Sequence, residues 1–129
     1  MFVYDDGGRL DAGLKGKSGD CAVRAVAIAT GMKYKEAQAL IKDFSAKGKL
    51  GSKAIANGVY KEDLDAALRS IGWKWFSAPK FEGRKARYSD INGIAIVRMA
   101  RHYAAVIEGE LRDSWDSSEK MVYGYWAKA

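Results

Sequence analysis

The chain has 129 residues, with 48% hydrophobic and 29% charged side chains, a composition that excludes a disordered chain and fits one globular domain over residues 1–129. Its 22 Lys and Arg outnumber its 16 Asp and Glu, and this formal charge of +6 favours weak contact with nucleic acid or acidic surfaces. A single cysteine excludes an internal disulfide and indicates a reducing, cytoplasmic setting. The most apolar run, 21–32, is too short to span a bilayer, so no membrane partner is expected.

Residues 20–30 predict a helix that begins next to the only cysteine of the chain. Ser18 or Asp20 can cap this helix, and Gly31 can end it in a left-handed conformation. Cys21 then lies in the first turn, where the helix dipole favours a thiolate and so a nucleophile.

The same helix is apolar almost all round, which is typical of a buried, central helix. Arg24 is the exception. We expect it to form a structural ion pair with an acid such as Asp116 or Asp90, because a buried charge needs a partner.

Apolar residues at helical spacing predict two further helices, over about 34–46 and 61–71, separated by a loop over 47–59. After Gly72 the pattern changes to period two with β-branched and aromatic residues. Strands are expected at 2–4, 73–76, 94–99, 102–107, 110–114 and 121–126. Helices followed by strands indicate an α+β fold, in which the cysteine-bearing helix packs on a C-terminal antiparallel sheet.

The only histidine, His102, opens the first strand of a predicted hairpin. If Glu108-Gly109 is a two-residue turn, Ile107 pairs with Glu110. His102 and Asp113 then share one face as diagonal neighbours, within reach of a carboxylate–imidazole hydrogen bond. A three-residue loop would shift the register and bring Asp116 to His102 instead, so Asp116 is the reserve for this role.

These residues suggest the chemistry of a cysteine nucleophile with a histidine base. Cys21 would attack, His102 would take and return the proton, and Asp113 would orient the imidazole. The backbone N–H of Cys21 is a candidate oxyanion donor, because the first amides of a helix have no internal partner. Residues 1–20 contain no Asn, Gln or His, so Lys17, Ser18 or another backbone amide would supply a second donor. One Cys and one His do not make a usual zinc site, and no metal or cofactor is expected.

A Cys at a helix start, a His opening a strand, and an acid or amide on the next strand are the layout of papain-like cysteine peptidases. Residues 112–115 (RDSW) resemble the Asn-Ser-Trp around the third catalytic residue of that family, with Asp in place of Asn. Three segments resemble small papain-fold proteins of bacteriophage and bacterial genomes: 20–31 (DCAVRAVAIATG), 101–118 (RHYAAVIEGELRDSWDSS) and 122–126 (VYGYW). The resemblance implies a papain-like α+β fold, with Cys21 as nucleophile, His102 as base and Asp113 as orienting residue. The oxyanion glutamine of papains has no counterpart upstream of Cys21.

The function expected from these features is that of a cysteine hydrolase acting on a peptide, isopeptide or other amide bond of a peptide or protein substrate. Acyl transfer through the same thioester is equally compatible with the residues. One alternative, implied by the resemblance, is a catalytically silent papain-fold binding protein, such as a phage factor acting on a host protein in the host cytoplasm. Another is a basic nucleic-acid-associated protein, since a basic run with interleaved aromatic residues occupies 80–88.

Overall fold

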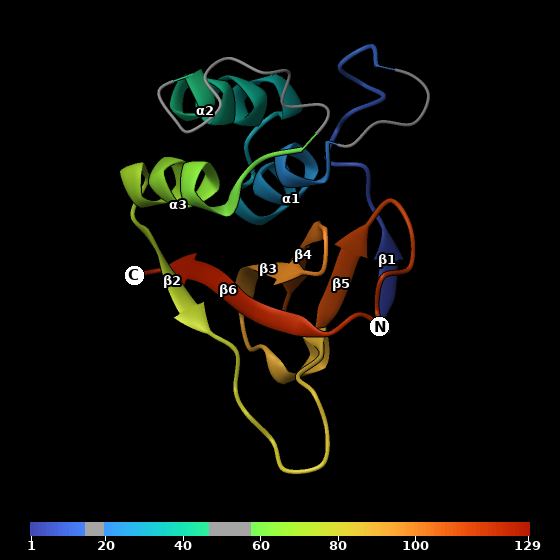
Figure 1. Cartoon of the computed structure of the whole chain (residues 1–129). Helices are drawn as coiled ribbons and strands as arrows, with labels where there is room; N and C mark the ends of the chain where they lie inside the picture. Colours follow the sequence, from blue (N-terminus) through green and yellow to red (C-terminus); the bar gives the residue numbers. More distant parts are fainter. Residues whose placement is uncertain (15–19, 47–57) are drawn as a thin grey trace.

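The computed structural model describes residues 1–14, 20–46 and 58–129, so most of the loop expected at 47–59 lies outside the described residues. Within this part of the chain, three helices lie on one side of a six-stranded mixed sheet (Figure 1). The helices are α1 (Cys21–Thr30), α2 (Tyr34–Ala46) and α3 (Lys61–Ser70). Helix α1 packs on the middle of the sheet and α3 on its β2 edge, while α2 lies against both other helices. The architecture is therefore α+β, as predicted.

The sheet contains β1 (Phe2–Tyr4), β2 (Trp73–Ser77), β3 (Ile94–Met99), β4 (His102–Ile107), β5 (Glu110–Asp113) and β6 (Val122–Lys128), in the spatial order β1-β5-β4-β3-β6-β2. Strands β2 to β6 pair only antiparallel with one another, as expected. The expectation of a wholly antiparallel sheet is wrong, because β1 pairs parallel with β5. A three-residue strand carries no sequence signal for its direction, which is set by where the chain enters the sheet.

Strand β1 supports the strand that ends at Asp113. Tyr4 is the register partner of Asp113, and the next backbone N–H, of Asp5, donates to the Asp113 carbonyl oxygen at 2.9 Å. The chain then turns toward α1, where Gly7 has a φ of +68°. A Cβ at Gly7 would lie 3.0 Å from the Arg24 Cα, so only glycine allows this approach. The N-terminal segment thus joins the edge of β5 to the first turns of α1.

The two ends of α1 differ in how well they follow the sequence prediction. Gly31 ends the helix in the left-handed region with a φ of +79°, and its N–H donates to Ala27, as predicted. Asp20 occupies the N-cap position, but its side chain makes no hydrogen bond to the helix amides, so the predicted side-chain cap is wrong. The carboxylate is used in ion pairs instead, as described below. Ser18, the other capping candidate, lies outside the described residues.

Both faces of the sheet are buried. Toward the helices, Ile96, Tyr103 and Ala105 pack with the apolar residues of α1 in one core cluster. The opposite face forms a second cluster, which residues 78–91 cover through Ala86 and Ile91. Its sheet residues are Ala95, Val97, Met99, Ala104, Val106, Leu111 and Val122.

Gly124 on β6 marks a point where an indole ring lies directly against the backbone. A Cβ at this position would lie 2.2 Å from Cζ2 of Trp75, whose ring also packs edge-on against Trp126 at a centroid distance of 4.7 Å. We expect Gly124→Ala to lower the free energy of unfolding by about 1–3 kcal/mol, because Trp75 must leave its packed position. Urea unfolding measures this loss. In a Trp75→Leu background the same glycine substitution should cost less, with the Phe76 carbonyl oxygen at 2.8 Å as the remaining obstacle, and an equal cost in both backgrounds would show that the ring is not the cause.

Candidate active site

Cys21 is the first residue of α1 and is half-buried against the start of β4. The imidazole of His102 and the backbone N–H of Tyr103 lie close enough to its thiol to lower the pKa of the thiol. The structure therefore brings together the only cysteine and the only histidine of the chain. The thiol has two polar neighbours that favour its charged form.

The hairpin of β4 and β5 has the predicted register. Glu108 and Gly109 both have positive φ, 47° and 84°, as a two-residue type I′ turn requires, and Ile107 pairs with Glu110. This places His102 and Asp113 in contact, with Nε2 of the imidazole 2.5 Å from Oδ2 of the carboxylate. Because an imidazole has two ring nitrogens, Nδ1 is the one that remains to face the thiol.

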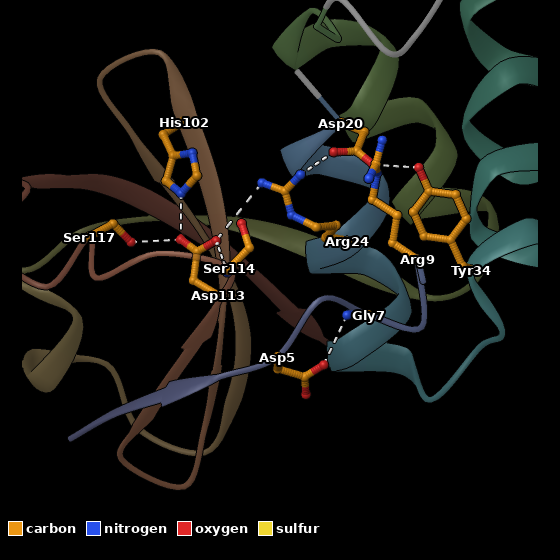
Figure 2. Close-up of polar contacts among 10 residues, drawn as sticks. All are labelled: Asp5, Gly7, Arg9, Asp20, Arg24, Tyr34, His102, Asp113, Ser114 and Ser117. Atoms are coloured by element: carbon orange, nitrogen blue, oxygen red, sulfur yellow. Dashed lines mark hydrogen bonds and ion pairs between the residues drawn. The ribbon is translucent and has the colours of Figure 1, made fainter. Parts of the chain in front are cut away.

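The carboxylate of Asp113 is buried, at 3% exposure, and is held on both oxygens (Figure 2). Oδ2 accepts from His102 and from the hydroxyl of Ser117 at 2.7 Å. Oδ1 accepts from the backbone N–H of Ser114 at 2.8 Å. The sequence analysis did not identify Ser117, for which the only indication in the sequence is a hydroxyl side chain four residues after Asp113. These bonds fix the carboxylate so that it can orient the imidazole.

The reserve acid is not part of the site. Asp116 is exposed, and its Oδ1 accepts from the backbone N–H of Ser118. Trp115, beside it, covers the imidazole instead: its ring centroid lies 4.7 Å from that of His102, although the side chain is 45% exposed. The indole thereby shields the His102–Asp113 hydrogen bond from solvent on one side.

A chain of charges extends from Asp113 into the N-terminal half of the protein (Figure 2). The buried guanidinium of Arg24 is paired with Asp20, and one of its terminal nitrogens lies 4.0 Å from Oδ1 of Asp113. Asp20, only 1% exposed, also accepts from Nε of Arg9 at 2.8 Å and from the hydroxyl of Tyr34. The cation therefore sits between two buried carboxylates, one at the start of α1 and one in the site.

The predicted partners of Arg24 were wrong. Asp90 is bound by both terminal nitrogens of Arg84 at 2.9 Å, and Asp116 lies on the surface. Asp20, four residues before Arg24 at the start of the same helix, pairs with Arg24 in place of the two predicted acids. The basic run that suggested nucleic-acid contact is partly neutralised in the same way, since its other arginine, Arg87, pairs with Glu119.

The environment changes the titration of both members of the Cys21–His102 pair. Burial alone raises the pKa of the Cys21 thiol, but the hydrogen bond and charge of His102, the Tyr103 N–H and the charge of Arg24 outweigh it, so this pKa lies below its ordinary value. Burial alone lowers the pKa of His102, and the hydrogen bonds to Asp113 and Cys21 outweigh it and raise this pKa to about 9. Each group therefore favours the charged form of the other, a thiolate beside an imidazolium.

The single histidine allows a direct test of this pair. We expect the ring proton signal of His102 in NMR to titrate at a pKa of about 9. In Asp113→Asn the pKa should fall toward 6.5 or below, because burial is then opposed by a weaker hydrogen bond. Asp116→Asn is the matched control and should leave the titration unchanged, since Asp116 does not contact the imidazole. A wild-type pKa near 6.5 would contradict the geometry.

The same shift gives a pH dependence of stability. The folded protein holds the His102 proton more tightly than the unfolded chain does, so the contribution is fully present below pH 6.5 and is lost as the pH rises through about 9. The lowered pKa of Cys21 acts in the opposite sense, and its contribution is lost as the pH falls through the folded-state pKa of the thiol. The contribution of His102 is therefore present on the acid side and that of Cys21 on the alkaline side.

The backbone N–H of Cys21 is the first amide of α1 and has no acceptor within the helix, which suits an oxyanion donor. The other two candidates, Lys17 and Ser18, lie outside the described residues. In the part of the chain that the structure describes, no three His, Cys, Asp or Glu side chains are grouped to hold a metal ion.

Comparisons of this chain with protein-family models, with curated proteins and with solved structures find no match. No helix among the described residues is long and apolar enough to cross a membrane. The function is therefore inferred from the residues of the site and their contacts.

Proposed function

We propose that the protein is a papain-like cysteine hydrolase that cleaves a peptide, isopeptide or other amide bond through Cys21, His102 and Asp113. The observation that carries this proposal is a single imidazole hydrogen bonded on one side to a half-buried thiol and on the other to a buried carboxylate. A cysteine that merely fills space in the core needs neither contact. The pKa of the thiol is lowered and that of the imidazole is raised, and both directions favour a nucleophilic thiolate.

In the first half of the reaction, the Cys21 thiolate attacks the carbonyl carbon of the scissile amide and forms a C–S bond. The negative charge moves to the carbonyl oxygen, where the backbone N–H of Cys21 can donate to it. His102, protonated at Nδ1, gives that proton to the leaving nitrogen as the C–N bond breaks. A thioester remains on Cys21, and His102 is neutral.

In the second half, neutral His102 takes a proton from a water molecule, whose oxygen attacks the thioester carbon. The C–S bond breaks, the acid is released, and the thiolate and imidazolium are restored. If an amine replaces the water, the same steps transfer the acyl group. Throughout, Asp113 keeps Nε2 protonated and holds the ring in place, since its Oδ2 lies 2.5 Å from that nitrogen.

The test follows acylation of Cys21 with p-nitrophenyl acetate. We expect a burst of one equivalent of nitrophenolate, an acetyl group on Cys21 in the intact mass, and continued release as the thioester hydrolyses. Cys21→Ser should lose the burst, His102→Ala should slow both phases, and Asp116→Asn should behave as wild type. Peptidyl aminomethylcoumarins then test amide cleavage.

Acetylation at the same slow rate in wild type and His102→Ala would contradict the proposal. It would leave the binding-protein alternative, in which Cys21 is not used for chemistry.

A further inference from the structure

Arg98 is the only charged residue in β3, a strand in the middle of the sheet. By alternation it lies on the same face as Ile96, which packs against the helices. Its neighbours Val97 and Met99 are fully buried on the opposite face, whereas Arg98 is partly exposed. A charged side chain at such a position requires either an ion-pair partner or a functional role.

The strand register places Arg98 close to the nucleophile. Arg98 is the direct partner of Tyr103 across the β3–β4 pair, so their Cβ atoms lie about 5 Å apart. The backbone N–H of Tyr103 lies next to the Cys21 thiol, and the charge of Arg98 acts on the Tyr103 hydroxyl, which donates to the Val59 carbonyl oxygen at 3.0 Å. Tyr103 thus lies between the sulfur and the guanidinium.

An aromatic ring lies on the other side of the guanidinium. The ring centroid of Tyr123 is 5.7 Å from Cζ of Arg98, and this tyrosine is 43% exposed. Tyr123 lies at the irregularity between Arg98 and Met99 where β6 gains a residue relative to β3. Such a bulge changes the direction of the side chains around it, and here it leaves the Tyr123 ring beside the Arg98 guanidinium.

No carboxylate among the described residues forms an ion pair with Arg98. Among the described residues, the ion pairs include every other arginine except Arg101, which lies exposed in the β3–β4 turn. Residues 15–19 and 47–57, which complete the chain, contain no Asp or Glu. The exposed Glu62 acts electrostatically on Tyr103 but forms no ion pair with Arg98 in the described structure. The guanidinium therefore keeps its charge available beside Tyr103.

We propose that Arg98, flanked by Tyr103 and Tyr123, binds a carboxylate of the substrate, so that the protein acts on acidic peptides. The proposal rests on the function proposed above and adds its substrate class. A guanidinium matches a carboxylate with two parallel hydrogen bonds, and the net charge of +6 attracts acidic partners from a distance. Because Tyr103 lies next to both Cys21 and Arg98, a substrate bound over Tyr103 would present its carboxylate to Arg98 and its scissile carbonyl to the thiol.

Two alkylating probes that differ in one charge test this site. They are the α-amides of N-iodoacetyl-glutamate and N-iodoacetyl-glutamine, and in each the thiolate forms a C–S bond at the methylene carbon while iodide leaves. The ratio of their rates at Cys21 is measured by intact mass. We expect the acidic probe to react faster by about three- to thirtyfold at low salt, and the preference to shrink at 1 M salt.

Arg98→Met should remove most of this preference and leave the rate of the neutral probe nearly unchanged, whereas Arg98→Lys should retain part of it. Arg101→Met removes an equal charge from the adjacent turn and serves as the control. A preference that survives Arg98→Met, or that falls equally in Arg101→Met, would overturn the proposal. Failure of the proposed function would show differently, as slow reaction of both probes with no dependence on His102.

Discussion

Replacing His102 by alanine is expected to slow alkylation of Cys21 by iodoacetamide at neutral pH by about tenfold or more, because each unit by which the pKa of the thiol rises lowers the thiolate fraction about tenfold. Without the imidazolium, the remaining dominant effect on the thiol is burial, which raises its pKa. A lowered pKa gives the wild-type thiol a larger thiolate fraction at every pH below that pKa, and the thiolate is the reactive species. The alkylation rate is measured from the intact mass, and the signal comes from Cys21 because the chain has a single cysteine.

The shape of the pH profile is part of the same expectation. In wild type the rate should rise through the low pKa of Cys21 and then stay level until His102 loses its proton at about pH 9. In His102→Ala the level region should disappear and the rise should move to alkaline pH. Coincident profiles for the two proteins would mean that Cys21 and His102 do not act as a pair.

Arg24→Met is expected to lower the free energy of unfolding by about 3 kcal/mol and to move the alkylation profile of Cys21 to higher pH. Removal of the guanidinium leaves Asp20 and Asp113, which are 1% and 3% exposed, without the cation between them. The positive charge of Arg24 also lowers the pKa of Cys21, so its loss raises that pKa. Urea unfolding and the alkylation profile measure the two effects separately.

Arg69→Met provides the matched control on α3. Arg69 pairs with Asp65 at the same i,i+4 spacing as Arg24 with Asp20, but its side chain is 69% exposed. Its removal should cost less than about 0.5 kcal/mol and leave the alkylation profile unchanged. Arg24→Lys should keep the charge and restore part of both properties. If Arg24→Met costs no more than Arg69→Met, the buried charge chain contributes little to the fold.

Much of this site could be predicted from the sequence because its residues are fixed by local rules. The dipeptide at 108–109 favours a two-residue turn, and the turn fixes which residues of 102–107 and 110–113 face each other. Asp113 rather than Asp116 follows directly from that register. The position of Cys21 likewise follows from the start of a helix that residues 20–31 define.

The charge chain could not be predicted in the same way. The sequence pattern favours Asp20 as a helix cap, but a buried guanidinium on the same helix competes for the carboxylate, and this contact depends on what else packs around α1. Tyr34 and Arg9, which also bind Asp20, come from separate segments. Ser117 reaches Asp113 only because residues 114–118 turn back on the end of β5. Such contacts require the tertiary structure.

The pairing of β1 with β5 has a consequence for how the protein folds. It joins Phe2 to Leu111, so two segments at a very large separation along the chain must meet before the edge of β5 is complete. Contacts of this kind have a high entropic cost and form slowly compared with local helices and hairpins. The helix that carries Cys21 and the hairpin that carries His102 and Asp113 are each local, whereas their meeting is not. We therefore expect activation of the thiol to come late in folding, and the cysteine of a partly folded chain to have the reactivity of an ordinary thiol.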